Sequence, residues 1–339
     1  MSRRRSRLST LATAGTVLAL AAGLSACGDD DSEKSAGSSG AAKGSVVIGA
    51  ASNGAAEEIT LDVPEVASIR AQLPESVTED GKLTIGLGML PAGSAPLGFL
   101  GDDQKTVTGS EPDLGRLVAA VFGLEAEPKN ATWENLFVGI DSGRTEAGFS
   151  NITDTEERKK KYEFACYRKD NLGFELRKEA DWNFDGTYKS LAGKTVAVAS
   201  GTNQEKILLE WRDKLESEGE KLDVKYFADN NSIHLALNSK KIDAYFGPNP
   251  AIAYHITQSA STPQATRSGG TYSGAGASLQ GLICATAKKG SGLAKPLAEA
   301  INYLIENGQY AKLLETWNLK DEAVRTSQVN PPGLPITNS

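Results

Sequence analysis

A polar turn that runs into a helix start contains the residues best suited to chemistry. It reads SNITDTEER, residues 150–158, and ends on Arg158. Asp154 precedes Glu157 by three positions, which is the spacing of a capping box and predicts a helix start. A cation in the first helical turn is disfavoured by the helix dipole. Either Arg158 lies on a solvated face with the three lysines that follow it, or its guanidinium and nearby N–H groups bind an anion such as a carboxylate.

The N-terminus has the features of an export signal. A basic stretch, MSRRRSR, precedes the apolar run LSTLATAGTVLALAAG, and LSAC ends at Cys27. This order predicts a signal peptide over residues 1–26, too short for a transmembrane helix. The LSAC sequence looks like a bacterial lipobox. It predicts cleavage before Cys27, a diacylglyceryl thioether on its sulfur, and a lipid anchor on the outer face of the cell membrane.

The remaining chain is acidic. Removing residues 1–26 takes away four arginines and no acidic residue, which changes the formal charge from -7 to -11. This charge argues against a nucleic-acid partner and against electrostatic binding to anionic lipid. His234, His255, Cys166 and Cys284 show no spacing typical of zinc ligands, so the sequence predicts no metal site. No G-x-S-x-G, P-loop or G-x-G-x-x-G motif predicts a catalytic residue or a cofactor.

Strands and helices alternate along most of the chain. Residues 27–45 are rich in Gly, Ser, Ala and charge, which predicts a flexible tether after the lipidated cysteine. Residues 46–81 form a leading segment, partly ordered, with helical spacing of apolar residues near its end. Strands are predicted over 83–87, 145–150, 194–199, 223–227, 242–247 and 281–287, and helices over 111–123, 133–141, 202–216, 232–239 and twice within 293–319. Such alternation indicates mostly parallel sheets with helices on both faces.

Two segments far apart in the sequence resemble each other. IDSGRTEAGFSN (140–151) and LNSKKIDAYFGPN (237–249) both pass from a helix end through a serine to a strand with an acid-Ala-x-Phe pattern. Each strand is followed by a loop of small residues. Ligands of open α/β sheets bind outside the carboxyl ends of the strands. Two similar lobes would therefore face these loops across a cleft, and the turn that holds Arg158 falls where a site is expected.

Five motifs in order make the chain resemble the polar amino-acid (family 3) solute-binding proteins of bacterial ABC importers. The resemblance covers about residues 82–320. The matching stretches are KLTIG, GSEPDLGRLVAAVFG, WENLFVGIDSGRTEAGFSNITDTEER, LAGKTVAVASGTNQE and KKIDAYFGP. The resemblance implies an α/β fold of the two-lobed periplasmic-binding-protein type (class II-like), with two mixed sheets flanked by helices and a two-strand hinge. It also implies a monomer.

The resemblance assigns expected ligand contacts. In the family, the arginine at the position of Arg158 clamps the ligand carboxylate. The position of Trp133 forms a wall against the ligand side chain. Further ligand-binding positions implied in this chain are Ser150, Asn151, Thr153, Gly201, Thr202, Asn203 and Asn249. Ordinary alternatives remain for some of these: core packing for Trp133, a tight turn for Gly201, and helix capping for the threonines.

The chain departs from the family where the ligand's ammonium group is expected. The acid and aromatic after the first strand are missing from GLGMLPAGSAPLGF, and the second-lobe acid is replaced by Pro248. Asn249 can offer a neutral carbonyl, and Glu111 can compensate only if it points inward. A buried ammonium needs such a partner. We therefore expect a small carboxylate-bearing solute whose nitrogen is absent, acylated or placed differently.

The resemblance also predicts discontinuous lobes. Lobe 1 is expected over 82–176 and 284–320, lobe 2 over 177–283, and a C-terminal tail over 321–339. Cys166 and Cys284 then lie on lobe 1 near the hinge. They can form a disulfide in an oxidising compartment, or they can remain free thiols packed in apolar stretches.

The predicted function is that of a lipid-anchored extracytoplasmic binding protein, not an enzyme. It would deliver a small carboxylate-bearing solute, such as an amino acid, to ABC permease subunits by closure of its two lobes. A sensory binding protein without a transport role would have the same fold and lipobox. A dehydratase or lyase on this fold is a third alternative. A neighbouring permease and ATPase gene pair would favour the first.

Overall fold

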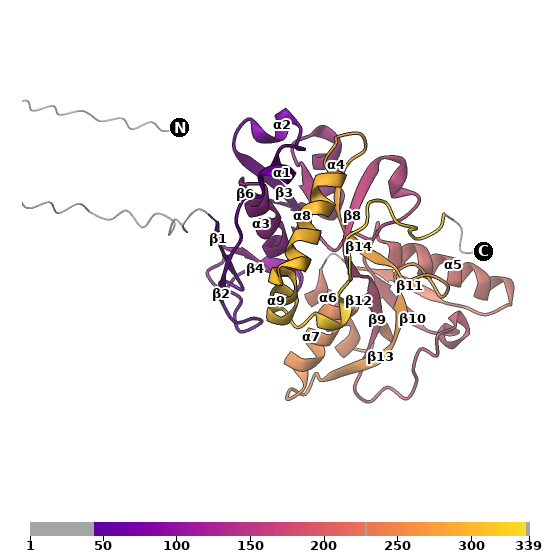
Figure 1. Cartoon of the computed structure of the whole chain (residues 1–339). Helices are drawn as coiled ribbons and strands as arrows, with labels where there is room; N and C mark the ends of the chain where they lie inside the picture. Colours follow the sequence, from indigo (N-terminus) through magenta and orange to yellow (C-terminus); the bar gives the residue numbers. More distant parts are fainter. Residues whose placement is uncertain (1–43, 228, 337–339) are drawn as a thin grey trace, which may run out of the picture. The chain divides into compact units, whose positions relative to one another are not determined.

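The computed structural model describes residues 44–227 and 229–336, which form two mixed sheets flanked by helices (Figure 1). The predicted signal peptide, Cys27 and all of the tether except its last two residues lie outside the described residues. Within the described ranges, no helix combines the length and the apolar character that a membrane crossing requires.

The first sheet has the strand order β6-β3-β7-β14-β8. Its strands are β3 (Lys82–Leu90), β6 (Glu125–Thr132), β7 (Ala147–Gly148), β8 (Tyr162–Lys169) and β14 (Leu282–Lys288). Its helices are α3 (Ser110–Val121), α4 (Trp133–Ser142), α8 (Ala294–Glu306) and α9 (Gln309–Thr316). In Figure 1 the yellow helices α8 and α9 lie against the much earlier α3, so the end of the chain completes the first lobe.

The second sheet has the strand order β11-β10-β12-β9-β13. Its strands are β9 (Asn171–Arg177), β10 (Thr195–Val198), β11 (Asp223–Tyr226), β12 (Ala244–Pro248) and β13 (Thr266–Ser273). Its α-helices are α5 (Asn203–Ser217), α6 (Asn230–Asn238) and α7 (Asn249–Ser259), with a short 3₁₀ turn, η2 (Tyr188–Leu191). A separate buried apolar cluster forms the core of each lobe.

The sheets are mixed rather than mostly parallel. Pairings of β3 with β6 and β7, and of β10 with β11 and β12, are parallel, as expected for strands joined by helices. Four further pairings, which involve β8, β9, β13 and β14, are antiparallel. The sequence reasoning did not predict β6, β8, β9, β13 or α7. β8 and β9 are largely buried, so their residues show no clear polar–apolar alternation.

The two similar segments occupy equivalent places in the two lobes. Glu146 accepts a hydrogen bond at 2.7 Å from the backbone N–H of Thr84 in β3, and Asp243 accepts one at 2.8 Å from the backbone N–H of Thr195 in β10. Each acid thereby fixes the start of the strand that follows it, β7 or β12, next to its parallel neighbour, β3 or β10. The sequence similarity of 140–151 and 237–249 therefore reflects a structural repeat.

The chain crosses between the sheets at different points from those predicted. The first crossing is at Asp170, because β9 pairs with β12 and β13 and thus belongs to the second lobe. The second lies between β13 and β14, within residues 274–281. The two crossings are hydrogen-bonded to each other, since Asp170 N–H donates to Gly281 O and Gly274 N–H donates to Asp170 O.

The leading segment is ordered in the described residues. It contains a hairpin of β1 (Ser45–Ile48) and β2 (Ile59–Asp62), followed by the short helices α1 (Ala67–Arg70) and α2 (Glu75–Thr78). A second hairpin, β4 (Phe99–Leu100) with β5 (Val107–Thr108), precedes α3. Apolar residues of the leading segment, such as Ile48 and Val63, are fully buried in the first lobe.

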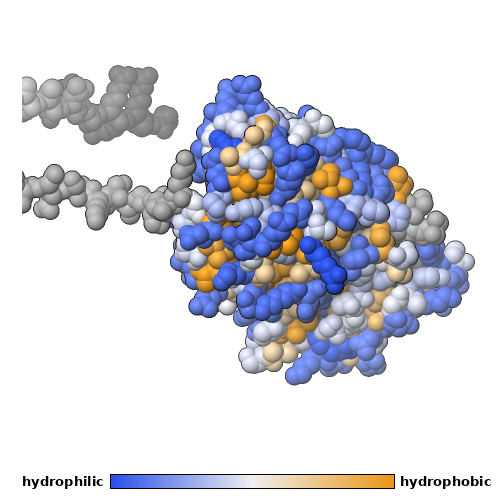
Figure 2. Space-filling view, in the orientation of Figure 1, coloured by the Kyte–Doolittle hydropathy of each residue, from blue (hydrophilic) through white to orange (hydrophobic). Residues whose placement is uncertain are grey.

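The C-terminal segment packs onto both lobes. After η3 (Lys320–Glu322), Val329 forms a bridge with Ala165 in the first lobe. Leu334 pairs with Thr155 and is buried in the apolar cluster of the second lobe. The segment from 321 to 336 therefore contributes to the fold, although the sequence predicted only a tail. The face of the molecule seen in Figure 2 is mainly hydrophilic, with apolar residues in separate small groups.

Candidate ligand-binding cleft

A cavity of about 220 Å³ lies between the two lobes. Lobe 1 contributes the end of β3, the loop after it, and the residues after β7. Lobe 2 contributes the N-terminal ends of α5 and α6 and the end of β12. The wall mixes apolar and polar residues, and its larger apolar side chains include Met89, Leu90, Trp133, Phe227, Ile233 and Tyr245. This is the position at which the carboxyl ends of parallel strands meet a ligand.

Helix starts supply the cleft with backbone N–H groups. The hydroxyl of Thr202 accepts from Glu205 N–H at 3.2 Å and caps α5, and Asp229 accepts from Ser232 N–H at 3.0 Å and caps α6. The first N–H groups of a helix have no partner within that helix. Asn203 and Gln204 are the first two residues of α5, so their backbone N–H groups have no partner within the helix and lie at the cleft wall. The Gln204 side-chain oxygen is buried and has no hydrogen-bond partner in the described structure.

Five of the nine predicted ligand contacts line this cavity: Ser150, Asn151, Trp133, Thr202 and Asn203. Arg158, Thr153, Gly201 and Asn249 do not. The hydroxyl of Thr153 is 2.7 Å from Asp170 Oδ2 and 2.9 Å from Asn203 Oδ1, so it joins the crossing to α5. Asn249 is the first residue of α7, behind Pro248, which does line the cavity.

Arg158 lies in a second cavity, of about 300 Å³, that shares Trp133 with the first. Its guanidinium donates to Thr153 O at 2.9 Å and to Gly201 O at 3.5 Å. It also lies over the rings of Trp133 and Phe137, at 5.4 and 5.3 Å from their centroids. Burial lowers the pKa of Arg158 to about 10. The side chain is thus half-buried between the lobes and is not on a solvated face.

The expected capping box at Asp154 and Glu157 does not form. Arg158 begins a three-residue 3₁₀ turn, η1 (Arg158–Lys160), and its N–H donates to the hydroxyl of Thr155 at 3.0 Å. Asp154 is instead buried, 3.3 Å from Lys159 Nζ, and burial raises its pKa to about 7. The cause is the pairing of this turn with Leu334, which the local sequence does not encode.

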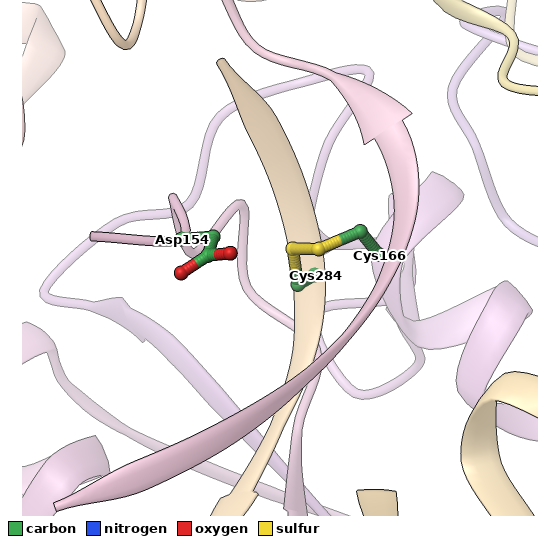
Figure 3. Close-up of side chains that lie close together, drawn as sticks. All are labelled: Asp154, Cys166 and Cys284. Atoms are coloured by element: carbon green, nitrogen blue, oxygen red, sulfur yellow. A yellow bond between two sulfur atoms is a disulfide. The ribbon is translucent and has the colours of Figure 1, made fainter. Parts of the chain in front are cut away.

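Cys166 and Cys284 form a disulfide between the neighbouring strands β8 and β14 (Figure 3). Both cysteines are buried. Asp154 lies beside the bridge in Figure 3, with a carboxylate oxygen within 4.8 Å of both sulfur atoms. The bridge therefore connects the two strands that lead to the two crossings.

The two acids on the cleft wall already have partners. Glu111 accepts from Asn151 N–H at 2.8 Å and from Arg168 at 2.9 Å, and the Tyr167 hydroxyl also donates to it. Asp229 accepts from both the N–H and the hydroxyl of Ser232. Glu111 therefore does not offer the free carboxylate that would replace the missing family acids.

Several wall residues escaped the sequence reasoning, including Met89, Phe227, Asn230 and Tyr245. Asp229 lies directly before Asn230 and three residues before Ser232. This is a helix-start signal that could have directed attention to α6. Tyr245 lies in the acid-Ala-x-Phe strand already recognised as a repeat. Met89, near the end of β3, and Phe227, directly after β11, gave no signal, because apolar residues that line a cleft are indistinguishable from core residues in sequence.

A two-lobed α/β structure with a cleft at the strand ends is the fold of the periplasmic-binding-protein type. The chain belongs to the bacterial extracellular solute-binding proteins, family 3, whose model matches residues 87–320. It acts outside the cytoplasm as a solute-binding protein and is not an enzyme.

Named relatives share this class. The L-cystine-binding protein TcyJ of Escherichia coli (strain K12) is 29% identical over 250 residues, which cover 72% of this chain and 85% of that protein. The arginine-binding protein ArgT of Corynebacterium glutamicum is 26% identical over 277 residues, which cover 81% of this chain and 86% of that protein. Among solved structures, the amino acid ABC transporter substrate-binding protein AbpA from Streptococcus pneumoniae, bound to L-arginine, has a TM-score of 0.60 at 21% identity, over 74% of this chain and 100% of that chain.

Proposed function

We propose that this chain is the lipid-anchored substrate-binding protein of an ABC importer, and that it captures a small carboxylate-bearing solute by closure of its two lobes. The observation that carries the proposal is the cleft between the lobes, with helix starts on its wall. Its volume of about 220 Å³ is below the roughly 300–1,000 Å³ of drug-sized pockets and suits a solute of amino-acid size.

Carboxylate recognition is supported by the N-terminal end of α5. The N–H groups of Asn203 and Gln204 and the helix dipole favour a negative charge at this position. Arg158 reaches the same region, because its guanidinium contacts the carbonyl of Gly201, two residues before α5. Its bond to that carbonyl is long, at 3.5 Å, so a carboxylate competes effectively for the guanidinium.

The acids that hold an ammonium group in the family are absent from this chain. Among the described residues on the cleft wall, Glu111 is paired with Arg168, whereas Asp229, which caps α6, and Gln204 Oε1, which has no partner, can accept from a displaced nitrogen. An unpaired ammonium in this cleft would carry a high desolvation cost. The solute class is therefore an amino-acid derivative with a masked or displaced nitrogen, or an organic acid.

Closure of the lobes is supported by the two hydrogen-bonded crossings at Asp170 and 274–281. Contacts that already join the lobes stabilise a closed form: Trp133 Nε1 donates to Gly201 O at 3.0 Å, and Asn230 donates to the Ser94 hydroxyl at 3.0 Å. The lipobox at Cys27 supports the membrane anchor, and the similarity to AbpA, an amino acid ABC transporter substrate-binding protein, supports an ABC permease as partner.

A thermal-shift screen of the purified chain tests the solute class. It should include the common amino acids, with arginine and cystine, as well as opines, short peptides and organic acids. We expect stabilisation by an organic acid or a derivatised amino acid. Micromolar binding of an ordinary α-amino acid would refute the proposed class while leaving the binding function intact.

Arg158→Ala tests the role of the guanidinium. Truncating one partner of a buried charge pair costs roughly 2–5 kcal/mol, so affinity for the solute found in the screen should fall about 30-fold to several thousand-fold. The matched control is Arg144→Ala, which truncates an exposed arginine after α4 whose side chain donates to the Ser142 hydroxyl. Calorimetry that shows equal affinity for both variants would remove Arg158 from the site.

A further inference from the structure

Three side chains that are far apart in the sequence converge on the second lobe, next to the solute cleft but outside its wall. Glu175 lies in β9, between β12 and the edge strand β13 of the second sheet, and its side chain is fully buried. His234 comes from α6 and His255 from α7, and they are the two histidines of the chain. Their side chains remain 19% and 25% exposed. The cluster thus has a buried anion and two imidazoles that solvent can reach.

The carboxylate of Glu175 is incompletely satisfied. Its Oε1 accepts from the Thr266 hydroxyl at 2.6 Å and lies 2.5 Å from His255 Nδ1. Its Oε2 lies 3.4 Å from His234 Nε2 and has no hydrogen-bond partner within the described structure. A buried carboxylate oxygen without a hydrogen bond is available as a ligand for a cation.

The two imidazole rings are stacked, with centroids 3.4 Å apart and planes at 3°. One carboxylate oxygen and one nitrogen from each ring lie within 4.8 Å of one another. Nitrogen and oxygen donors at such separations suit a small transition-metal dication.

Space for the ion and for a further ligand lies beside the cluster. A cavity of about 470 Å³ is lined by Glu175, His234 and His255, together with polar residues such as Asn238 and Gln258. An ion can enter from this cavity, and water can complete its coordination. Because the rings are parallel, one of them must turn about its Cβ–Cγ bond to aim both lone pairs at one point.

We propose that Glu175, His234 and His255 form a binding site for a transition-metal dication such as Zn²⁺. The ion takes the place of the contact between His255 and Glu175, binds the free carboxylate oxygen, and joins β9 to α6 and α7. Spacing in the sequence gives no sign of this site, because its ligands come from three separate elements. The inference does not depend on which solute occupies the cleft.

Calorimetry with Zn²⁺ alone tests the site, on the purified chain made without a histidine tag and treated with a chelator. We expect one ion per chain at micromolar or tighter Kd. His234→Gln and His255→Gln should each weaken binding at least about tenfold, and the double variant should abolish it. Gln258→Ala, which lines the same cavity without supplying one of the three ligands, should bind as the unmodified chain does. No binding to the unmodified chain, or equal binding by the double variant, would overturn the proposal.

A spectroscopic measurement on the unmodified chain covers the case in which the histidine variants fail to fold. Co²⁺ bound to two imidazoles and a carboxylate should give visible absorption bands and shifted imidazole proton resonances. Added Zn²⁺ should displace the Co²⁺ and abolish both signals. Because Cys27 can also bind metals, the same spectrum is recorded for Cys27→Ala and should be unchanged. Loss of the bands in Cys27→Ala would place the ion on that thiol and refute the site.

Discussion

Replacing both Cys166 and Cys284 by alanine removes a covalent bond between β8 and β14, the strands that lead to the two crossings. The bridge closes a loop of 118 positions. In the chain-entropy model, closing a loop of this length lowers the entropy of the unfolded chain and thereby stabilises the folded state by about 5 kcal/mol at 25 °C. Since domains are typically stable by only about 5–15 kcal/mol, the double variant should lose a large part of its stability.

Urea unfolding followed by tryptophan fluorescence measures this loss. The oxidised chain, the chain reduced after unfolding, and the double alanine variant are compared, with Cys27→Ala as the control that keeps the bridge. We expect the reduced chain and the double variant to agree within about 1 kcal/mol. A reductant should leave the folded protein unchanged, because both sulfur-bearing residues are buried.

A thiol count gives the decisive check on this reasoning. The chain has three cysteines, so the oxidised protein should show at most one free thiol in denaturant, that of Cys27. Three free thiols before reduction would mean that the bridge does not form. A double variant as stable as the unmodified protein would show that the bridge does not restrict the unfolded chain as the entropy model assumes.

Further predictions concern the lobe contacts. Burial raises the pKa of Asp170 to about 6 from its ordinary value of 3.8. Between pH 3.8 and 6 the folded protein therefore keeps this proton while the unfolded chain has lost it. The free energy of unfolding should fall by roughly 3 kcal/mol as the pH rises through this range. Asp170→Asn should remove this part of the pH dependence in urea unfolding from pH 4 to 7, and an unchanged slope would contradict it. Leu334→Ala should cost about 2–5 kcal/mol in the same assay, whereas Ile336→Ala, at a position 51% exposed, should cost little; equal losses would argue against the buried C-terminal segment. Trp133→Phe removes the indole bond to Gly201 O, worth about 0.5–1.5 kcal/mol, and should weaken solute binding roughly two- to tenfold in calorimetry; unchanged affinity would exclude this bond from the bound form.

Elements with strong local signals were predicted from the sequence. The helices α3, α4, α5, α8 and α9 follow from apolar spacing and from helix starts and stops, such as Thr132 before α4 and Gly143 after it, in a left-handed conformation. The repeat of 140–151 in 237–249 correctly predicted two similar lobes whose loops face one cleft. These features depend on residues close together in the chain, so the sequence contains their causes.

The partners of the charged side chains were decided only by the tertiary structure. Glu111 was left open as an acid for the solute, but it pairs with Arg168, which follows it by 57 positions. The capping box at Asp154 fails because the turn pairs with Leu334, far along the chain. Glu175 meets His234 and His255 only once β9, α6 and α7 have packed together. Such contacts depend on which elements become neighbours in space, and no local pattern records that choice.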